Sequence, residues 1–81
     1  MKYPVFSIRD NKVGFMVPNC DQSRQSAIRN FSYAINNEGV MNYAPKDFDL
    51  YYVGEFDSDN GKIMSVLPEL VVSGENVYGE E

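Results

Sequence analysis

Residues 47–67 read DFDLYYVGEFDSDNGKIMSVL and contain the clearest secondary-structure pattern of the chain. Over residues 47–57 the side chains alternate, so that one face is mainly apolar and the other mainly polar. The apolar face comprises Phe48, Leu50, Tyr52, Gly54 and Phe56. This alternation is typical of a half-buried antiparallel strand. Residues 58–61 (SDNG) predict a tight turn, because Asn and Gly tolerate the positive φ angles that such turns require. The chain is then expected to return along residues 62–67, with Phe56 facing either Ile63 or Met64.

A second hairpin and a helix are expected before this stretch. Residues 3–8 are rich in β-branched and aromatic residues and predict a strand, which turns at residues 10–12 and returns through residues 13–17. An amphipathic helix follows over residues 22–37, with Asp21 as its N-cap and Gly39 as its stop. Its apolar positions are Ala27, Ile28, Phe31, Ala34 and Ile35.

The remaining segments complete a ββαββ order. Residues 39–46 are expected to form a loop, and Pro68 interrupts the last strand, so residues 70–72 are either a bent continuation or a separate short strand. Residues 73–81 are polar and acidic. The sequence therefore predicts one small α+β domain over residues 1–72, with an antiparallel sheet of two hairpins and one helix, and an acidic C-terminal tail over residues 73–81.

The amino-acid composition excludes several kinds of catalytic and metal-binding site. The 81 residues include no His and one Cys, with 7 Lys and Arg against 12 Asp and Glu, for a net charge of −5. Without His there is no Ser-His-Asp or Cys-His catalysis, and one Cys allows no internal disulfide and no multi-Cys zinc site. We therefore expect a protein that is not an enzyme and has no cofactor or metal.

Two acidic patterns and the single cysteine have ordinary explanations. Residues 55–61 contain carboxylates, but no frame places Gly at position 6 and Glu at position 12 of a calcium loop, so a solvated hairpin tip is favoured. The outward carboxylates of residues 47–57 show no apolar pocket that would suit acid–base catalysis. Cys20 precedes the helix, but the adjacent Asp21 opposes thiolate formation, which favours a structural or incidental cysteine.

The charge is unevenly spread along the chain. Residues 1–36 carry five basic and two acidic residues, for a net charge of +3, whereas residues 37–81 carry two basic and ten acidic ones, for −8. A basic face can therefore exist on an acidic protein. The candidates for phosphate contacts are Arg9, Lys12, Arg24 and Arg29, and those for stacking on bases are Phe15, Tyr33 and Tyr51. The alternative is a solvated face on which Arg24 and Arg29 pair with carboxylates elsewhere in the fold.

The tail and the aromatic content suggest protein partners. The candidate partner-binding residues are Glu75, Tyr78, Glu80 and Glu81, because acidic tails commonly engage basic surfaces. A small domain with spare aromatic residues often completes its core by self-association, so a homodimer or higher homo-oligomer is expected. The sequence shows no signal peptide and no apolar run long enough for a membrane span, so we expect a cytosolic protein without membrane contact.

Three blocks of sequence resemble a known family. They are Phe6-Ser7-Ile8-Arg9-Asp10 with Lys12, Gly14 and Phe15; Arg29-Asn30-Phe31; and residues 47–57 with Asp59 and Gly61. Together these blocks resemble the small nonstructural protein of gokushoviruses, single-stranded DNA phages of the microvirus group (Microviridae). The resemblance covers residues 3–72.

This resemblance implies a viral nonstructural protein made in the cytoplasm of the infected bacterial host. It further implies a role in regulating viral DNA replication or packaging, with single-stranded DNA binding as its expected mode of action. The family offers no active-site residues to transfer. The alternative function is an acidic interaction module that docks on a phage or host replication or assembly protein.

Overall fold

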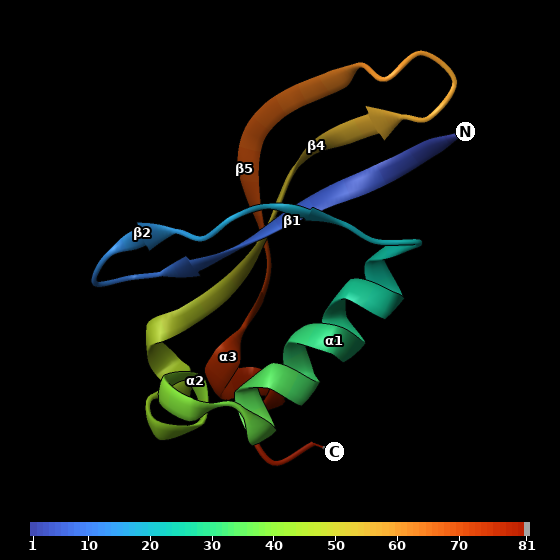
Figure 1. Cartoon of the computed structure of the whole chain (residues 1–81). Helices are drawn as coiled ribbons and strands as arrows, with labels where there is room; N and C mark the ends of the chain where they lie inside the picture. The colour runs from blue at the N-terminus through green and yellow to red at the C-terminus, as the bar shows by residue number, and fades with distance from the viewer. Residues whose placement is uncertain (81) are drawn as a thin grey trace.

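The computed structural model describes residues 1–80 and consists of a strongly curled antiparallel sheet with three helices on one side (Figure 1). In chain order the elements are β1 (Lys2–Asp10), β2 (Gly14–Phe15), β3 (Asn19–Cys20), α1 (Arg24–Asn37), α2 (Gly39–Tyr43), a 3₁₀ turn (Pro45–Asp47), β4 (Phe48–Asp57), β5 (Ile63–Ser73) and α3 (Gly74–Val77). The strand order is β2-β1-β4-β5, and β3 pairs with the same edge of β1 as an interrupted extension of β2. The predicted α+β class and antiparallel sheet are confirmed.

The core lies between the sheet and α1. Phe31 and Ile35 of α1 are fully buried, and they belong to the same apolar cluster as Phe6 of β1 and Phe48 and Leu50 of β4. These are the apolar positions that the helical and strand periodicities predict. Each such side chain stabilises the fold by about 1.5–3 kcal/mol when it is removed from water.

The N-cap of α1 is Ser23, so the prediction of Asp21 is wrong. The Ser23 Oγ accepts a hydrogen bond of 3.1 Å from the backbone N–H of Ser26. Asp21 lies two residues further upstream and stabilises the helix through side chains instead. Its carboxylate accepts from the Ser26 hydroxyl at 2.7 Å and from the Asn30 amide at 3.0 Å. The carboxylate thereby ties the start of α1 to its second turn.

Two helical segments replace predicted irregular structure. The expected loop over residues 39–46 contains α2 and the 3₁₀ turn, because Met41 enters the core. The expected tail over residues 73–81 begins with α3, in which Val77 is 4% exposed and joins the same core cluster. The amide of Asn36 donates to the Val77 carbonyl at 3.0 Å and thus fastens α3 to α1. The acidic tail therefore does not begin at Ser73.

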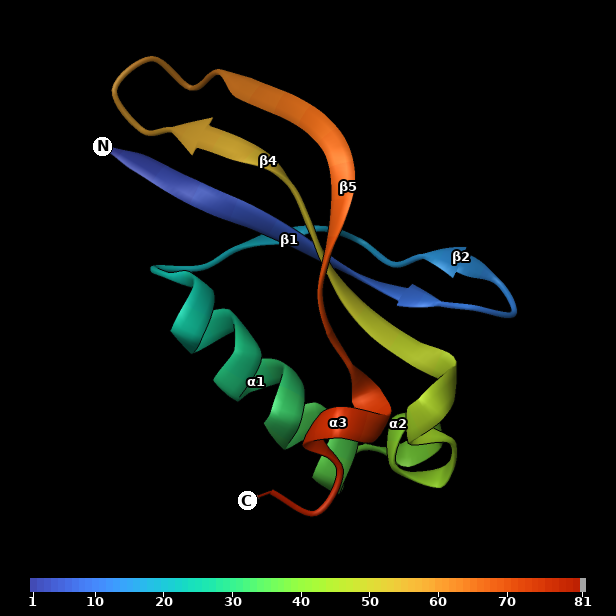
Figure 2. The same cartoon turned by 180° about the vertical axis from the view of Figure 1, so that it is seen from behind.

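The register of the β4–β5 hairpin is resolved. Phe56 faces Ile63, and β5 continues through Pro68 to Ser73 as one bent strand. Pro68 is tolerated because β5 is an edge strand, on which a missing N–H need not remove a ladder hydrogen bond. Figure 2 shows the hairpin extending beyond the helices, with β5 bending along its length beside β4.

A bulge in β4 changes which face its side chains occupy. Val5 pairs with Gly54 and Phe6 with Tyr52, so Val53 is an extra residue in the ladder. The side-chain alternation shifts there, and Phe56 lies outside the core cluster of the described residues, contrary to the sequence-based prediction. The bulge places Glu55 on the same face of the sheet as Tyr52. Burial, followed by the nearby charges of Glu55 and Glu69, raises the pKa of Tyr52.

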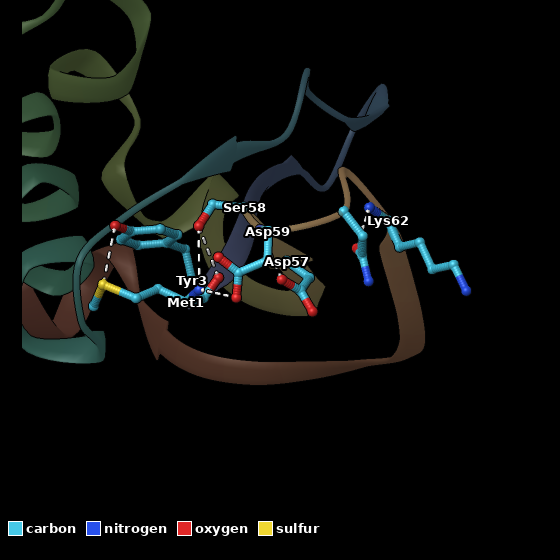
Figure 3. A network of polar contacts seen from close by, with 7 residues as sticks. Met1, Tyr3, Asp57, Ser58, Asp59 and Lys62 are labelled. Atoms are coloured by element: carbon cyan, nitrogen blue, oxygen red, sulfur yellow. Dashed lines mark hydrogen bonds and ion pairs between the residues drawn. The ribbon is translucent and has the colours of Figure 1, made fainter.

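The acidic side chains of the turn after β4 contact the N-terminus and the backbone of the turn itself (Figure 3). The N-terminal ammonium lies 3.0 Å from Asp59 Oδ2 and donates to the Ser58 hydroxyl at 3.2 Å. The backbone N–H of Asp59 donates to Asp57 Oδ1 at 2.9 Å.

Across residues 1–80, no group of three or more His, Cys, Asp or Glu side chains is arranged to hold a metal ion. None of the helices described is long and apolar enough to cross a bilayer.

We predict that Val77→Ala lowers the free energy of unfolding by about 1.5–2.5 kcal/mol, because it removes two buried methyl groups from the core and leaves a cavity. Urea unfolding followed by circular dichroism measures the change. Glu75→Ala, on the exposed side of the same short helix, is the control and should change stability by less than about 0.5 kcal/mol. Equal stability of the two variants would contradict the docking of α3.

Candidate nucleic-acid interface

Three of the predicted DNA-binding residues meet on the face of the sheet that points away from α1. Arg9 of β1 lies directly opposite Phe15 of β2, and Tyr51 of β4 reaches the same place. The Arg9 guanidinium lies 5.1 Å from the centre of the Phe15 ring. The Phe15 and Tyr51 rings pack edge to face, with centres 5.3 Å apart and an interplanar angle of 71°. We call Arg9, Phe15 and Tyr51 the sheet cluster.

The alternation of β1 and β4 explains why these side chains share a face. Phe6 and Leu50 point toward α1, so their neighbours in sequence on the two strands point to the opposite side. Phe15 remains 45% exposed. Within residues 1–80 the Arg9 guanidinium makes no ion pair, which leaves its N–H donors available to an anion. The guanidinium therefore lies over the ring of a half-exposed aromatic side chain.

Lys12 lies in the turn of the same β1–β2 hairpin. Its ammonium is 3.7 Å from Asp47 Oδ2, and its side chain is largely exposed. An exposed pair at this distance is weak, so the ammonium can exchange this carboxylate for a phosphate at little cost. Lys12 is thus a second cation on the hairpin that carries Arg9 and Phe15.

The other predicted DNA-binding residues lie on α1 and not with the sheet cluster. Arg24 pairs with Glu69 of β5 at 3.9 Å, so for this residue the alternative of pairing with a distant carboxylate is realised. Arg29 and Tyr33 lie one turn apart on α1 and line a hollow with Val77 and Glu80. Because α1 covers the face of the sheet opposite to the sheet cluster, the seven candidates form two separate surfaces.

The predicted partner-binding residues are also divided. Glu75 and Tyr78 line a hollow with Tyr43 and Lys46, at the side of α3 away from α1. Glu80 lies in the hollow of Arg29 and Tyr33 instead. Glu81 lies outside the described residues.

One feature that sequence reasoning missed is an apolar hollow of about 730 Å³ between α1 and the chain that joins β2 to β3. Phe6, Phe31 and Leu50 form part of its wall, and Asp21 and Asn30 provide polar groups. The hollow lies where the ladder to β1 is interrupted between β2 and β3, after the backbone N–H of Met16 donates to the Ile8 carbonyl at 2.7 Å. Pro18, which follows Val17 in an otherwise strand-like run, was the available signal for this break.

The carboxyl of Asp21 at this hollow has a perturbed pKa. Burial by itself raises the pKa, but hydrogen bonds from the Ser26 hydroxyl, the Gln22 backbone N–H and the Asn30 amide outweigh burial and lower it below its ordinary value. The ionised carboxylate is therefore part of the folded structure. Cys20, beside it, is an exposed free thiol.

The fold and the sheet cluster together define a small α+β protein with an exposed aromatic and cationic surface. Comparison with known families identifies the group, because residues 3–77 match the model of the phage ORF5 protein family. The chain belongs to this family of bacteriophage proteins. No curated protein and no solved structure matches the chain.

We predict that Asp21→Asn lowers the free energy of unfolding at pH 7 by about 1–2 kcal/mol, through the loss of charge-assisted hydrogen bonds on a partly exposed group. The folded pKa is depressed, so this stabilisation is complete above the unfolded pKa of about 3.9 and disappears as the pH falls through the lower folded pKa.

Urea unfolding at several pH values between 7 and 2.5 should show the two proteins converging in acid. Glu75→Gln serves as the control for removal of one exposed carboxylate. A difference between Asp21→Asn and the wild type that stays constant down to pH 2.5 would contradict the role of the ionised carboxylate.

Proposed function

We propose that this phage protein is a non-enzymatic regulator of viral DNA replication or packaging that binds single-stranded DNA through the sheet cluster. The family match supports a phage protein, and the resemblance to the gokushovirus nonstructural protein supports the replication or packaging role in the cytoplasm of the bacterial host. The observation that carries the DNA-binding proposal is the position of the Arg9 guanidinium, which makes no ion pair within residues 1–80, over the half-exposed Phe15 ring.

The chemistry of the sheet cluster suits a single strand better than a duplex. Unpaired bases offer flat π surfaces, and stacking on an aromatic side chain contributes about 1–3 kcal/mol per base regardless of sequence. Arg9 and Lys12 lie on the same hairpin as Phe15 and can bind the phosphates that flank a stacked base. The net charge of −5 opposes binding to the dense phosphate charge of duplex DNA.

We predict that the protein binds fluorescein-labelled oligo-dT with a Kd in the micromolar range at low salt, and that a duplex of equal length binds more weakly. Arg9→Gln should weaken binding and make the slope of log K against log salt concentration shallower by about 0.7, because one phosphate contact is lost. Phe15→Leu should weaken binding by about tenfold, the equivalent of 1.4 kcal/mol of stacking, and leave the salt slope unchanged. Fluorescence anisotropy titrations measure both quantities.

The matched control is Lys62→Gln, which removes an exposed cation in the β4–β5 turn, beyond the end of β4 opposite to the one that pairs with Arg9. It should change the affinity by less than twofold. The double variant Arg24→Glu/Arg29→Glu tests the helix surface, and a complete loss of binding in it would move the interface to α1. Absence of any anisotropy change at low salt would refute DNA binding altogether.

A second candidate function is docking on a phage or host replication or assembly protein. The observation that favours it is the gathering of two exposed tyrosines, Tyr43 and Tyr78, with the carboxylate of Glu75 around one hollow. Exposed aromatic residues beside acidic ones suit a basic protein surface. This surface is separate from the sheet cluster, so the two functions are compatible.

We predict that Glu75→Gln/Tyr78→Ser leaves oligo-dT binding unchanged but impairs phage growth when it replaces the wild-type gene. The substitutions spare Val77, which a deletion of residues 74–81 would remove from the core along with the acidic side chains. The growth control is Glu38→Gln, an exposed carboxylate at the end of α1. Normal growth of the double variant would remove the support for docking through this surface.

A further inference from the structure

The first half of β5 is an apolar edge strand that nothing in the described chain covers. β5 spans 11 residues, with an irregularity at residues 66–68 opposite Val53, and within residues 1–80 it pairs with β4 alone. Its outer side therefore has backbone N–H and C=O groups without strand partners. Its exposed apolar side chains are Ile63, Met64, Val66, Leu67 and Leu70. Figures 1 and 2 show this part of the hairpin standing clear of the helices from both sides.

The opposite edge of the sheet does not share this property. β2 and β3 are two residues each, and pairing is interrupted between them, which limits the length of chain that another strand can join. The two edges of the sheet are therefore unequal. A strand-pairing partner would join β5 and not the edge formed by β2 and β3.

The charge on β5 favours a protein partner. Residues 63–67 contain no charged side chain, and the one charged side chain in residues 63–73 is Glu69, whose carboxylate lies 3.9 Å from Arg24 in an exposed pair. A strip without free cations offers nothing to phosphate groups. A strip without free carboxylates, on a chain of net charge −5, is also a place where two copies of this protein can approach with little repulsion.

The sequence of the strip is complementary to itself. Residues 63–67 read IMSVL, with a central Ser65 flanked on each side by two apolar residues. An antiparallel pair of identical strands related by a twofold axis places residue i opposite residue i at the axis. With Ser65 on the axis, Met64 faces Val66 of the second copy, and Ile63 faces Leu67. Every apolar side chain of this segment then meets another apolar side chain.

We propose that the protein forms a homodimer in which β5 pairs with β5 of a second copy around Ser65, joining the two sheets into one. Pro68 lacks an N–H and limits the new ladder to residues 63–67. The dimer covers the exposed apolar strip, and the twofold symmetry closes the assembly at two chains. The proposal concerns β5 alone and does not depend on DNA binding by the sheet cluster.

The first experiment is sedimentation equilibrium of the wild-type protein, which should give twice the mass of one chain. Leu67→Asp should give the mass of one chain, because Leu67 is 90% exposed and its replacement by a carboxylate costs the folded monomer little. The matched control is Val13→Asp, at a position 87% exposed in the β1–β2 turn, which should remain dimeric. Circular dichroism melting confirms that each variant is folded.

The second experiment tests the register. In a Cys20→Ser background, Ser65→Cys places two thiols opposite each other at the twofold axis, within the Cα separation of a disulfide, and mild oxidation should link the chains. Val13→Cys in the same background should remain unlinked. A wild-type mass of one chain, a dimeric Leu67→Asp, a mass above two chains, or equal linking at positions 65 and 13 would each overturn the proposal.

Discussion

β4 is paired with a neighbouring strand on both of its edges, and this pairing fixes the positions of the other elements. β4 joins β1 on one side and β5 on the other, and its Phe48 and Leu50 supply the floor on which Phe31 and Ile35 of α1 pack. Without β4, β1 and β5 would not belong to one sheet, and α1 would lose the two β4 side chains on which it packs. A domain of 81 residues has only one such core, so every surface feature takes its position from this strand.

The same strand separates the functional surfaces. Alternation along β4 sends Leu50 into the core and Tyr51 to the outer face, where it meets Phe15 and Arg9. The α1 candidates consequently lie on the other side of the sheet. The basic residues of the N-terminal half are thus divided between two faces, and only the group on the outer face joins an aromatic ring to a guanidinium without an ion pair in the described chain.

Side-chain periodicity predicts much of the core, but it does not predict that the residues of the sheet cluster lie together. The helical spacing of Phe31 and Ile35 and the alternation at Phe48 and Leu50 identify side chains that are buried in the structure. Local patterns succeed at these positions because one face of each element meets the core. The three residues of the sheet cluster are candidates in the sequence, but their proximity is not visible there. It results from pairing between β1, β2 and β4, and contacts between distant segments do not follow from composition or spacing.

Side-chain periodicity and turn chemistry are local properties, and they are enough to predict the α+β class, the antiparallel hairpins and the main helix. Two results come from the folded chain alone: the bulge at Val53 moves Phe56 out of the core, and Val77 enters it. The strand order also leaves β5 as an apolar edge of the sheet. These outcomes depend on register and on which surfaces meet, and the free energy of burial is gained only when segments far apart in the chain come together.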